Sequence, residues 1–377
     1  MAEIPQLVTH QSLLVSDQSK PIIKKSVKVL AEIPNLNTIP SNYDYYSNTT
    51  NKIPLEEHYY QGSEQEDSVP IIDFSLLTSN DPDQRSKVIQ ELSRACQDWG
   101  FFMLINHGIQ EKAMKAAIGA CNGFFNMEEE DKLEYEGSHP LHGIRYGTSF
   151  NVAKDNVFFW RDFLKLMVHP HFHCPTKPLE LSEVLLDYSR RNREVAMELL
   201  EGVSESLGLE KNEMQKELEL ESGYQLFVAN YYPPCPEPER AIGMPPHSDH
   251  GLLTFLIDNG IGGLEIQHNG KWLPINTTIP NAILVNVGDQ LEVFSNGKYK
   301  SVLHRAVLNN KVTRLSLGFA NGPSLEATLS PATKLIQTTN CVPAYIAIKY
   351  KDYLELQQTN QLKEKSCLES LKNQLIN

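Results

Sequence analysis

His247 and Asp249, two positions apart, are a pair of residues whose types and spacing could do chemistry together. On an extended backbone, residues two apart point to the same face, so one imidazole and one carboxylate can meet a single metal ion. A hydrogen-bonded surface pair is the alternative for these two residues alone. His304 is a further candidate ligand, and it lies in an apolar, strand-like run. Two histidines and one carboxylate can form a facial triad, which leaves metal positions open, as iron(II) oxygenases require.

A second pair, Arg314 and Ser316, follows ten residues after His304 and is again spaced for one face of a strand. The guanidinium offers a two-pronged donor for a carboxylate, and the hydroxyl can add another hydrogen bond. The alternative role for Arg314 is a structural ion pair. The alternative role for His304 is that of a core histidine whose hydrogen bonds are satisfied within the protein. Together, metal triad and carboxylate clamp suit a dicarboxylate such as 2-oxoglutarate, whose keto-acid end can chelate iron.

Several longer motifs occur in order around these residues. They are Pro-Ile-Ile-Asp-Phe at 70–74, Gly-Phe-Phe at 100–102, Asn-Tyr-Tyr-Pro-Pro at 230–234 and Gly-Asp-Gln-Leu-Glu at 288–292. With the triad and the Arg-x-Ser pair, they make the chain resemble the plant-type 2-oxoglutarate/Fe(II)-dependent dioxygenase family. The resemblance extends over roughly residues 68–355, and several motifs in one order are far more specific than a lone triad.

The resemblance implies a double-stranded β-helix (jelly roll) with iron(II) held by His247, Asp249 and His304. It also implies that 2-oxoglutarate is bound by four further residues, namely Arg314, Ser316, Asn230 and Tyr232. Such an enzyme consumes dioxygen and 2-oxoglutarate, releases succinate and carbon dioxide, and hydroxylates, desaturates or demethylates a small metabolite. Ascorbate is the expected reductant.

The residue types and spacings leave three other functions open. Some relatives share the triad and the Arg-x-Ser pair without consuming 2-oxoglutarate, so a 2-oxoglutarate-independent oxidase of the same fold is one alternative. A non-catalytic jelly roll that binds a small ligand is another, because fold alone does not imply catalysis. A hydrolase that uses Ser248 is disfavoured, since on an extended chain this hydroxyl lies on the opposite face from His247.

The substrate pocket can be predicted from strand parity. If Arg314 and Ser316 face inward, Gly318 and Ala320 do too, and such small side chains leave room for a bulky substrate. Tyr146 and Phe150, in a glycine-containing stretch, are expected at the mouth of the pocket.

Two further features of the sequence, a single histidine and a three-residue run, are assigned structural roles and no role in catalysis. By the same parity argument, His250 points away from the metal and is expected at the polar surface. The Trp-Arg-Asp run at 160–162 indicates local packing plus an ion pair.

The helices and strands expected around these residues indicate an α+β fold with a mainly β core, flanked by N-terminal and C-terminal helices. Helical spacing of apolar residues predicts helices near 26–33, 81–99, 109–126, 182–207 and 344–358. Short apolar runs separated by Gly, Pro and Asn predict strands at 69–74, 101–105, 225–231, 252–257, 263–266, 282–287, 302–308 and 314–320. The expected organisation is an extension at 1–67, a mainly helical region at 68–222, a jelly-roll catalytic core at 223–325 and a helical cover at 326–377.

Composition excludes several other classes of protein. Of the 377 residues, 41% are hydrophobic, which is enough for a substantial core, and the formal net charge is −13. An acidic surface repels phosphate backbones and anionic lipid heads, so nucleic-acid and membrane partners are not expected. We find no long apolar run and no signal peptide, and the six cysteines are scattered singly. A monomer in the cytoplasm that binds a small-molecule substrate is the resulting expectation.

Overall fold

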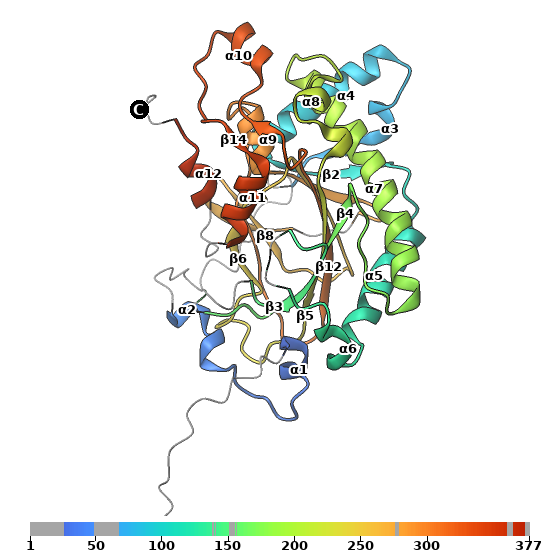
Figure 1. Cartoon of the computed structure of the whole chain (residues 1–377), viewed down its shortest axis with the longest axis vertical. Coiled ribbons are helices and arrows are strands. Elements are labelled where there is room, and N and C mark those ends of the chain that lie inside the picture. The colour runs from blue at the N-terminus through green and yellow to red at the C-terminus, as the bar shows by residue number, and fades with distance from the viewer. Residues whose placement is uncertain are drawn as a thin grey trace, which may run out of the picture.

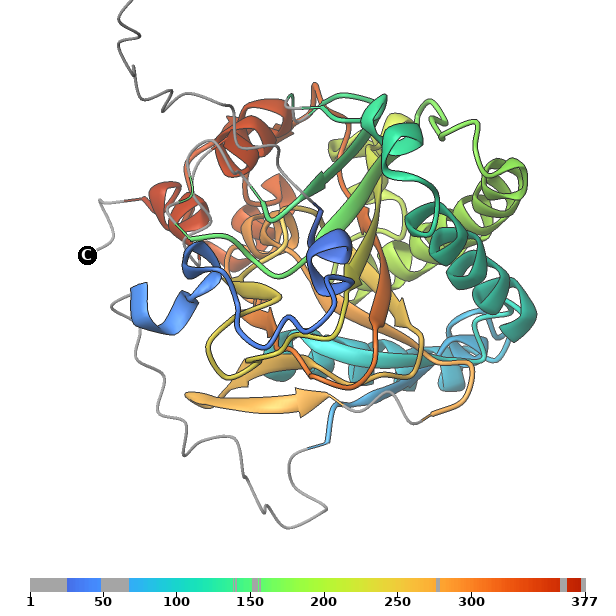
Figure 2. The same cartoon turned by 90° about the horizontal axis from the view of Figure 1, so that it is seen from below.

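A computed structural model describes residues 26–48, 68–137, 139, 141–150, 155, 157–275, 279–359 and 365–373. Two β-sheets form the centre of the molecule, and helices lie outside them (Figures 1 and 2). In spatial order, the larger sheet contains β1 (Ile71–Asp73), β2 (Phe101–Ile105), β10 (Ile283–Val287), β7 (Leu253–Asp258), β12 (Arg314–Asn321), β5 (Gln225–Tyr232), β4 (Asp162–His169) and β3 (Ile144–Thr148). The smaller sheet contains β6 (Met244–His247), β11 (His304–Ala306), β8 (Leu264–His268) and β9 (Lys271–Ile275).

The chain alternates between the two sheets from β5 to β12. Strands β5, β7, β10 and β12 belong to the larger sheet, whereas β6, β8, β9 and β11 belong to the smaller one. This alternation produces the double-stranded β-helix, so the predicted α+β fold with a jelly-roll core is confirmed. A short third sheet joins β13 (Thr328–Leu329) to β14 (Ile348–Lys349).

The helices of the described residues lie mainly on the outside of the larger sheet and at the C-terminal end of the chain (Figure 1). They are α1 (Val27–Ala31), α2 (Tyr45–Asn48), α3 (Phe74–Leu77), α4 (Pro82–Arg94), α5 (Glu111–Phe125), α6 (Glu129–Leu133), α7 (Leu179–Ser206), α8 (Glu213–Glu217), α9 (Asp289–Phe294), α10 (Thr333–Thr339), α11 (Tyr350–Thr359) and α12 (Ser366–Ser370). Short 3-10 turns occupy Ser41–Tyr43 and Leu220–Ser222. None of these helices is long and apolar enough to cross a membrane.

Helix α4 illustrates how local sequence determines a boundary. The Asp81 side chain accepts hydrogen bonds from the backbone N–H groups of Asp83 and Gln84, which caps the helix where the sequence predicted its start. The helix continues as a π-helical turn, Ala95–Trp99, and ends at Gly100, where φ is +64°. A Cβ on Gly100 would lie 2.3 Å from the carbonyl oxygen of Lys300, so only glycine fits this position.

Several sequence-based assignments differ from the structure in detail. The strand predicted at 69–74 ends at Asp73, because the Asp73 carboxylate caps α3. The helix predicted at 344–358 begins only at Tyr350, because the two residues before it pair with β13. The mainly helical region at 68–222 also contributes β1 to β4 to the larger sheet, where β4 pairs directly with β5.

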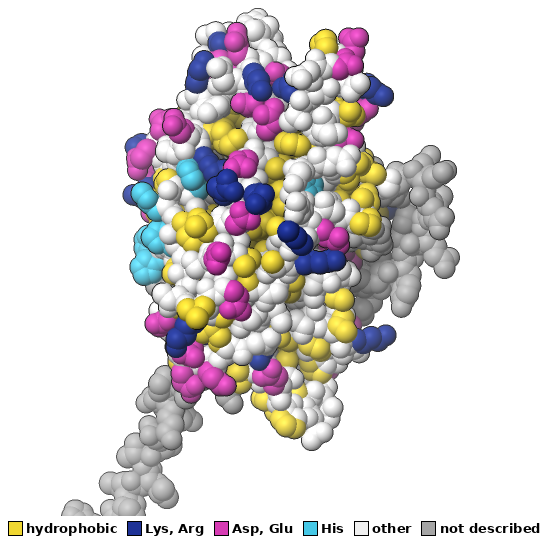
Figure 3. Space-filling view, turned by 90° about the vertical axis from the view of Figure 1, so that its right-hand side faces the viewer, with side chains coloured by type: hydrophobic (Ala, Val, Ile, Leu, Met, Phe, Trp, Pro, Cys, Tyr) yellow, Lys and Arg dark blue, Asp and Glu magenta, His cyan; other side chains and the backbone are white. Residues whose placement is uncertain are grey.

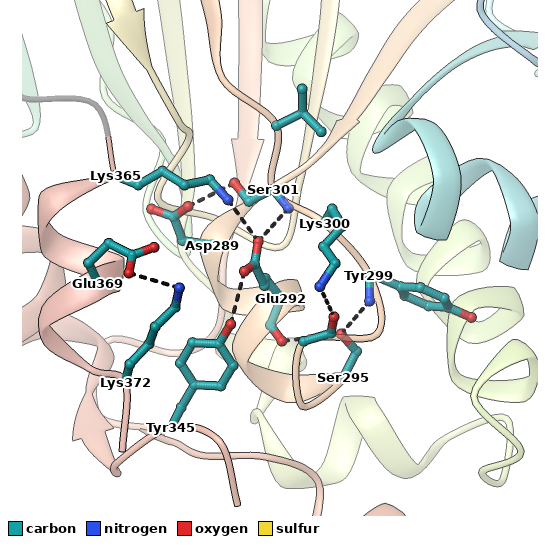
Figure 4. Close-up of polar contacts among 12 residues, drawn as sticks. Asp289, Glu292, Ser295, Tyr299, Lys300, Ser301, Tyr345, Lys365, Glu369 and Lys372 are labelled. Atoms are coloured by element: carbon teal, nitrogen blue, oxygen red, sulfur yellow. Dashed lines mark hydrogen bonds and ion pairs between the residues drawn. The ribbon is translucent and has the colours of Figure 1, made fainter. Parts of the chain in front are cut away.

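The C-terminal helices are attached to α9 through a buried cluster of polar groups (Figure 4). The Glu292 carboxylate accepts hydrogen bonds from the Ser301 N–H at 2.7 Å, the Tyr345 hydroxyl at 2.9 Å and the Lys365 ammonium at 3.0 Å. Asp289, at the start of α9, accepts a hydrogen bond from the Ser301 hydroxyl at 2.7 Å. These contacts connect the C-terminal region to the loop that carries Asp249, since the Asp289 N–H donates to the Asp249 carbonyl at 2.8 Å.

Candidate metal and cosubstrate site

Three candidate metal ligands meet at the end of the smaller sheet. His247 ends β6 and lies opposite His304 on the neighbouring strand β11, and Asp249 follows just beyond the strand end. One ligand atom from each of the three lies within 4.8 Å of the others. The Oδ1 atom of Asp249 lies 3.9 Å from Nε2 of His247 and 3.6 Å from Nε2 of His304. Among the described residues, no other group of three such side chains comes together in this way.

The two imidazoles present lone pairs to the centre of this cluster. Nδ1 of His247 lies 2.8 Å from the Pro245 carbonyl, and Nδ1 of His304 lies 3.2 Å from the Val302 carbonyl. A carbonyl only accepts, so each Nδ1 carries a proton, and Nε2 is the atom that each neutral ring can offer to a metal. Burial, and then the neighbouring His304, lower the pKa of His247 to about 3, which keeps its ring neutral and able to bind a metal.

The Asp249 carboxylate is held in place by a neighbouring strand. The side-chain amide of Asn286 on β10 donates to Oδ2 of Asp249 at 2.9 Å, while Oδ1 faces the histidines. Although burial acts in the opposite direction, the two histidines and this amide lower the pKa of Asp249. Two imidazole Nε2 atoms and one carboxylate oxygen therefore converge. This set of metal-binding atoms fits iron(II).

A cavity of about 140 Å³ extends from the triad along the inner face of the larger sheet. Its lining includes the triad, Asn286, Arg314, Ser316, Asn230, Tyr232, Gly318, Ala320, Phe101, Phe150, Arg161, Lys165, Leu226, Val228, Met244, His250, Leu264 and Gln357. Cations and polar groups are thus concentrated in a largely apolar pocket, as is usual for small-molecule sites.

The four residues expected to bind 2-oxoglutarate are paired across two strands. Arg314 on β12 lies opposite Tyr232 on β5, and Ser316 lies opposite Asn230. All four line the cavity, so the structure brings them together with the triad. Arg314 is further oriented by hydrogen bonds to the Ile261 carbonyl at 3.1 Å and to Asp258 on β7 at 3.4 Å.

Of the four residues predicted to contact substrate, three line the cavity and one does not. Phe150, Gly318 and Ala320 are part of the lining. Tyr146 is instead buried in the core on the other face of the sheet, because its place on β3 is opposite Leu164, and its hydroxyl donates to Glu129 at 2.8 Å. The expectation that Tyr146 lies at the mouth of the pocket is therefore corrected.

His250 also departs from its predicted place at the surface. It is buried, it lines the cavity, and its Nδ1 lies 2.8 Å from the Tyr350 hydroxyl. The strand-parity argument failed because β6 ends at His247, and beyond that point the chain no longer alternates faces.

The run at 160–162 is more than local packing. Arg161 lines the cavity and donates to the side-chain oxygen of Asn230 at 3.0 Å. The Asp162 carboxylate accepts from the N–H groups of Val27 and Lys28, both at 2.8 Å, and thereby anchors the N-terminal helix α1. Asp162 thus has a capping role in place of the ion pair expected from the sequence.

Lys165 is a cavity residue that sequence reasoning missed altogether. The signal was available, because Leu164, Leu166 and Val168 repeat at period two in this stretch, which marks a half-buried strand. The alternate positions, Arg161 and Lys165, then face the other side, which is the cavity.

Comparisons with known proteins agree with this geometry. Residues 223–323 match the profile of the 2OG-Fe(II) oxygenase superfamily, and residues 69–186 match that of the non-haem dioxygenase in morphine synthesis N-terminal family. The chain is 41% identical over 302 residues to 2-oxoglutarate-dependent dioxygenase 19 of Oryza sativa subsp. japonica, covering 80% of this chain and 89% of the relative. It is 40% identical over 308 residues to Protein DOWNY MILDEW RESISTANCE 6 of Arabidopsis thaliana, with the same coverage.

A solved structure is similar over nearly the whole chain. JOX2, crystallised in complex with 2OG, Fe and JA, superposes with a TM-score of 0.80 at 30% sequence identity, covering 94% of this chain and 98% of JOX2. The cosubstrate and metal of that complex are the pair that the triad and the Arg-x-Ser strand fit here. This chain is therefore a member of the plant-type 2-oxoglutarate/Fe(II)-dependent dioxygenase family, an oxidoreductase that depends on iron(II) and 2-oxoglutarate.

Proposed function

We propose that His247, Asp249 and His304 are the iron ligands of this dioxygenase. The observation that carries the proposal is the orientation of the two imidazoles, whose Nδ1 atoms face main-chain carbonyls and whose Nε2 atoms face Oδ1 of Asp249. When bound, iron(II) with 2-oxoglutarate supplies the activation of dioxygen for oxidation of a substrate C–H bond. Asn286 has the supporting role of holding the carboxylate toward the metal.

Four cavity residues bind 2-oxoglutarate in this proposal. Arg314 supplies a two-pronged donor for the distal carboxylate and Ser316 a hydroxyl donor, while Asn230 and Tyr232 complete the same wall from β5. Arg161 keeps the Asn230 amide oriented by donating to its oxygen. Burial of these groups excludes water, which strengthens each interaction with a bound dicarboxylate.

The substrate occupies the remaining part of the cavity, beside Phe150, Gly318 and Ala320. The small residues Gly318 and Ala320 leave room on this wall, and a Cβ placed on Gly318 would make ordinary van der Waals contacts at 3.9 Å without a clash. That space favours a bulky metabolite, which the enzyme hydroxylates, desaturates or demethylates with release of succinate and carbon dioxide.

The proposal extends to organisation and context. Residues 223–325 form the catalytic core, and residues 326–377 cover it, an assignment supported by Gln357 of α11, which lines the cavity and donates to the Ser248 carbonyl at 3.2 Å. We place the enzyme in the cytoplasm as a monomer, with ascorbate as reductant and no nucleic-acid or membrane partner. The net charge of −13 supports the absence of nucleic-acid and membrane partners. The interspersed acidic and basic side chains on the face in Figure 3 support it too, because they form no large basic patch there.

Anaerobic titration with iron(II) and then 2-oxoglutarate tests the proposed roles. Chelation of a keto acid to iron(II) produces a weak visible charge-transfer band. We expect this band in the wild type, its loss in His304→Ala, and a higher 2-oxoglutarate requirement in Arg314→Ala. A folded, iron-loaded wild type without the band, or a His304→Ala variant that keeps it, would refute the assignment.

A further inference from the structure

We propose that His250 binds the substrate of this enzyme by donating a hydrogen bond from its Nε2 atom, and that Tyr350 fixes the histidine tautomer that this donation requires. The inference rests on the proposed function of the cavity and names the substrate class for it. That class is an apolar molecule with a hydrogen-bond-accepting oxygen, such as the oxygen of a carbonyl group, close to the metal.

His250 is positioned beside the metal site. It follows the proposed ligand Asp249 directly in the chain, it is 6% exposed, and it is part of the cavity lining. Consecutive Cα atoms are about 3.8 Å apart, so the histidine lies in the part of the cavity next to the triad.

The backbone on both sides of His250 is held by main-chain hydrogen bonds. The Asp249 carbonyl accepts from the Asp289 N–H at 2.8 Å, and the Gly251 carbonyl accepts from the Gln290 N–H at 3.0 Å. His250 therefore has a fixed place in the cavity wall before any ligand binds, which reduces the entropy lost on binding.

Tyr350, at the start of α11, determines which nitrogen of His250 carries the proton. Its hydroxyl lies 2.8 Å from Nδ1 of His250, and the residue is fully buried. No other group among the described residues accepts a hydrogen bond from this hydroxyl. A buried O–H without an acceptor is destabilising, so the hydroxyl donates to Nδ1, which must then be unprotonated. The proton of the imidazole is consequently on Nε2.

Gly322 allows the Tyr350 phenol to reach His250. A Cβ at position 322 would lie 2.3 Å from the phenol oxygen, so a larger residue would displace the ring. The phenol and imidazole ring centres are 6.1 Å apart, and the two side chains meet through their polar atoms. The contact that sets the tautomer thus depends on a close approach to the end of β12.

The Nε2 atom of His250 is the donor that remains for a ligand. Nδ1 is occupied by Tyr350, and no described residue forms a hydrogen bond with Nε2. A donor in a buried cavity is stabilised by an acceptor, which a substrate oxygen can supply. Because an N–H group binds lone pairs, the matching substrate group is an acceptor and not a second donor.

The rest of the lining defines the body of the substrate. Apolar side chains make up much of the remaining wall, namely Phe101, Phe150, Leu226, Val228, Met244 and Leu264. These side chains bury a ring or chain without offering it further hydrogen bonds. The oxygen held by His250 therefore orients the molecule, and it brings the carbon atoms beside that oxygen toward the metal.

The tautomer of His250 is the first test of this inference. Heteronuclear NMR of protein labelled in its histidine nitrogens distinguishes a protonated ring nitrogen from an unprotonated one, and zinc(II) in place of iron(II) keeps the sample diamagnetic. His250→Gln identifies the signals by their loss. We expect a proton on Nε2 and none on Nδ1 in the wild type, and a mixture of tautomers in Tyr350→Phe. An unprotonated Nε2 in the wild type would overturn the inference.

Matched probes then test the contact itself, with the iron- and 2-oxoglutarate-loaded enzyme kept under argon. The probes are acetophenone and 1-indanone, compared with ethylbenzene and indane, which lack the oxygen, and ligand-observed NMR gives the dissociation constants. The ratio of hydrocarbon to ketone dissociation constants should be about 3- to 10-fold larger in the wild type than in His250→Leu, which loses one neutral hydrogen bond. His250→Gln should retain part of the preference for ketones, and His171→Leu, at an exposed histidine, should leave it unchanged.

A double variant separates this role from structure and from the proposed function. His250→Leu leaves the buried Tyr350 hydroxyl without an acceptor and should melt below the wild type, whereas His250→Leu with Tyr350→Phe removes both polar partners and should regain stability. The double variant should lose the preference for ketones and keep the iron–2-oxoglutarate band. A folded double variant that keeps the preference, or that loses the band, would overturn the inference. Absence of the band from the wild type would instead count against the proposed function.

Discussion

Arg314 and Tyr232 lie directly opposite each other on β12 and β5, with the guanidinium carbon of Arg314 5.4 Å from the centre of the Tyr232 ring. The ring, the Asp258 carboxylate and the Ile261 carbonyl together restrain the guanidinium. The carboxylate-binding group of the cavity is thus oriented before any ligand arrives, which reduces the entropy lost on binding.

The Arg314→Lys substitution tests the value of this orientation. Lysine keeps the charge but cannot form the two-pronged contact or stack on Tyr232, so we expect the KM for 2-oxoglutarate to rise by about 10- to 100-fold. Iron affinity should not change, since Arg314 does not touch the triad. Steady-state kinetics at varied 2-oxoglutarate checks this prediction, and an unchanged KM would contradict it.

Asn286→Ala should weaken iron binding without removing a ligand. The Asn286 amide orients the Asp249 carboxylate, and loss of such a supporting hydrogen bond typically lowers metal affinity by about 10- to 100-fold. Competition with a chromogenic iron(II) chelator measures the effect. Equal iron affinity in the variant and the wild type would mean that the amide has no such role.

Ala320→Phe should close the substrate part of the cavity. Ala320 lies opposite Leu226 and Thr254 on the flanking strands and faces the same space as Gly318. We expect loss of substrate-stimulated succinate release, with the iron–2-oxoglutarate band preserved. Turnover at the wild-type rate would show that the substrate does not pass this position.

Glu292→Gln should loosen the C-terminal helices from α9. Its carboxylate accepts from Ser301, Tyr345 and Lys365, so we expect a loss of about 1–3 kcal/mol in the free energy of unfolding. The control is Glu369→Gln, because Glu369 forms an exposed ion pair with Lys372 that contributes at most about 1 kcal/mol (Figure 4). Chemical denaturation compares the two variants, and equal losses would contradict the prediction.

Asp162 should contribute a pH dependence to stability. Burial raises the pKa of Asp162 to about 6, although the N–H groups of Lys28 and Val27 favour the carboxylate. Because this folded-state pKa lies above the unfolded value of about 3.9, its contribution is complete below that value and is lost as pH rises through 6. Relative to non-titrating Asp162→Asn, the wild type should lose about 2 kcal/mol between pH 4 and pH 7. Urea denaturation across this range checks the trend, and a constant difference between the two proteins would refute it.

The sequence by itself determined the reaction class and the residues that could carry it. His304 is identifiable because an ionisable side chain is costly in an apolar strand. The pairs His247 with Asp249 and Arg314 with Ser316 are identifiable by their period-two spacing. The mainly β core followed from short apolar runs separated by turn residues, the jelly roll from the family resemblance, and helix α4 from its capping aspartate.

Only the tertiary structure decided which further side chains face the cavity. Tyr146 was placed at the pocket mouth because it lies in a glycine-containing stretch, whereas β3 presents it to the core. His250 was misplaced because strand parity holds only within a strand, and the chain leaves β6 before this residue. Arg161 and Lys165 reach the cavity because β4 joins the larger sheet beside β5, a pairing between distant segments. Long-range strand pairing depends on the packing of whole sheets, so local sequence cannot specify it.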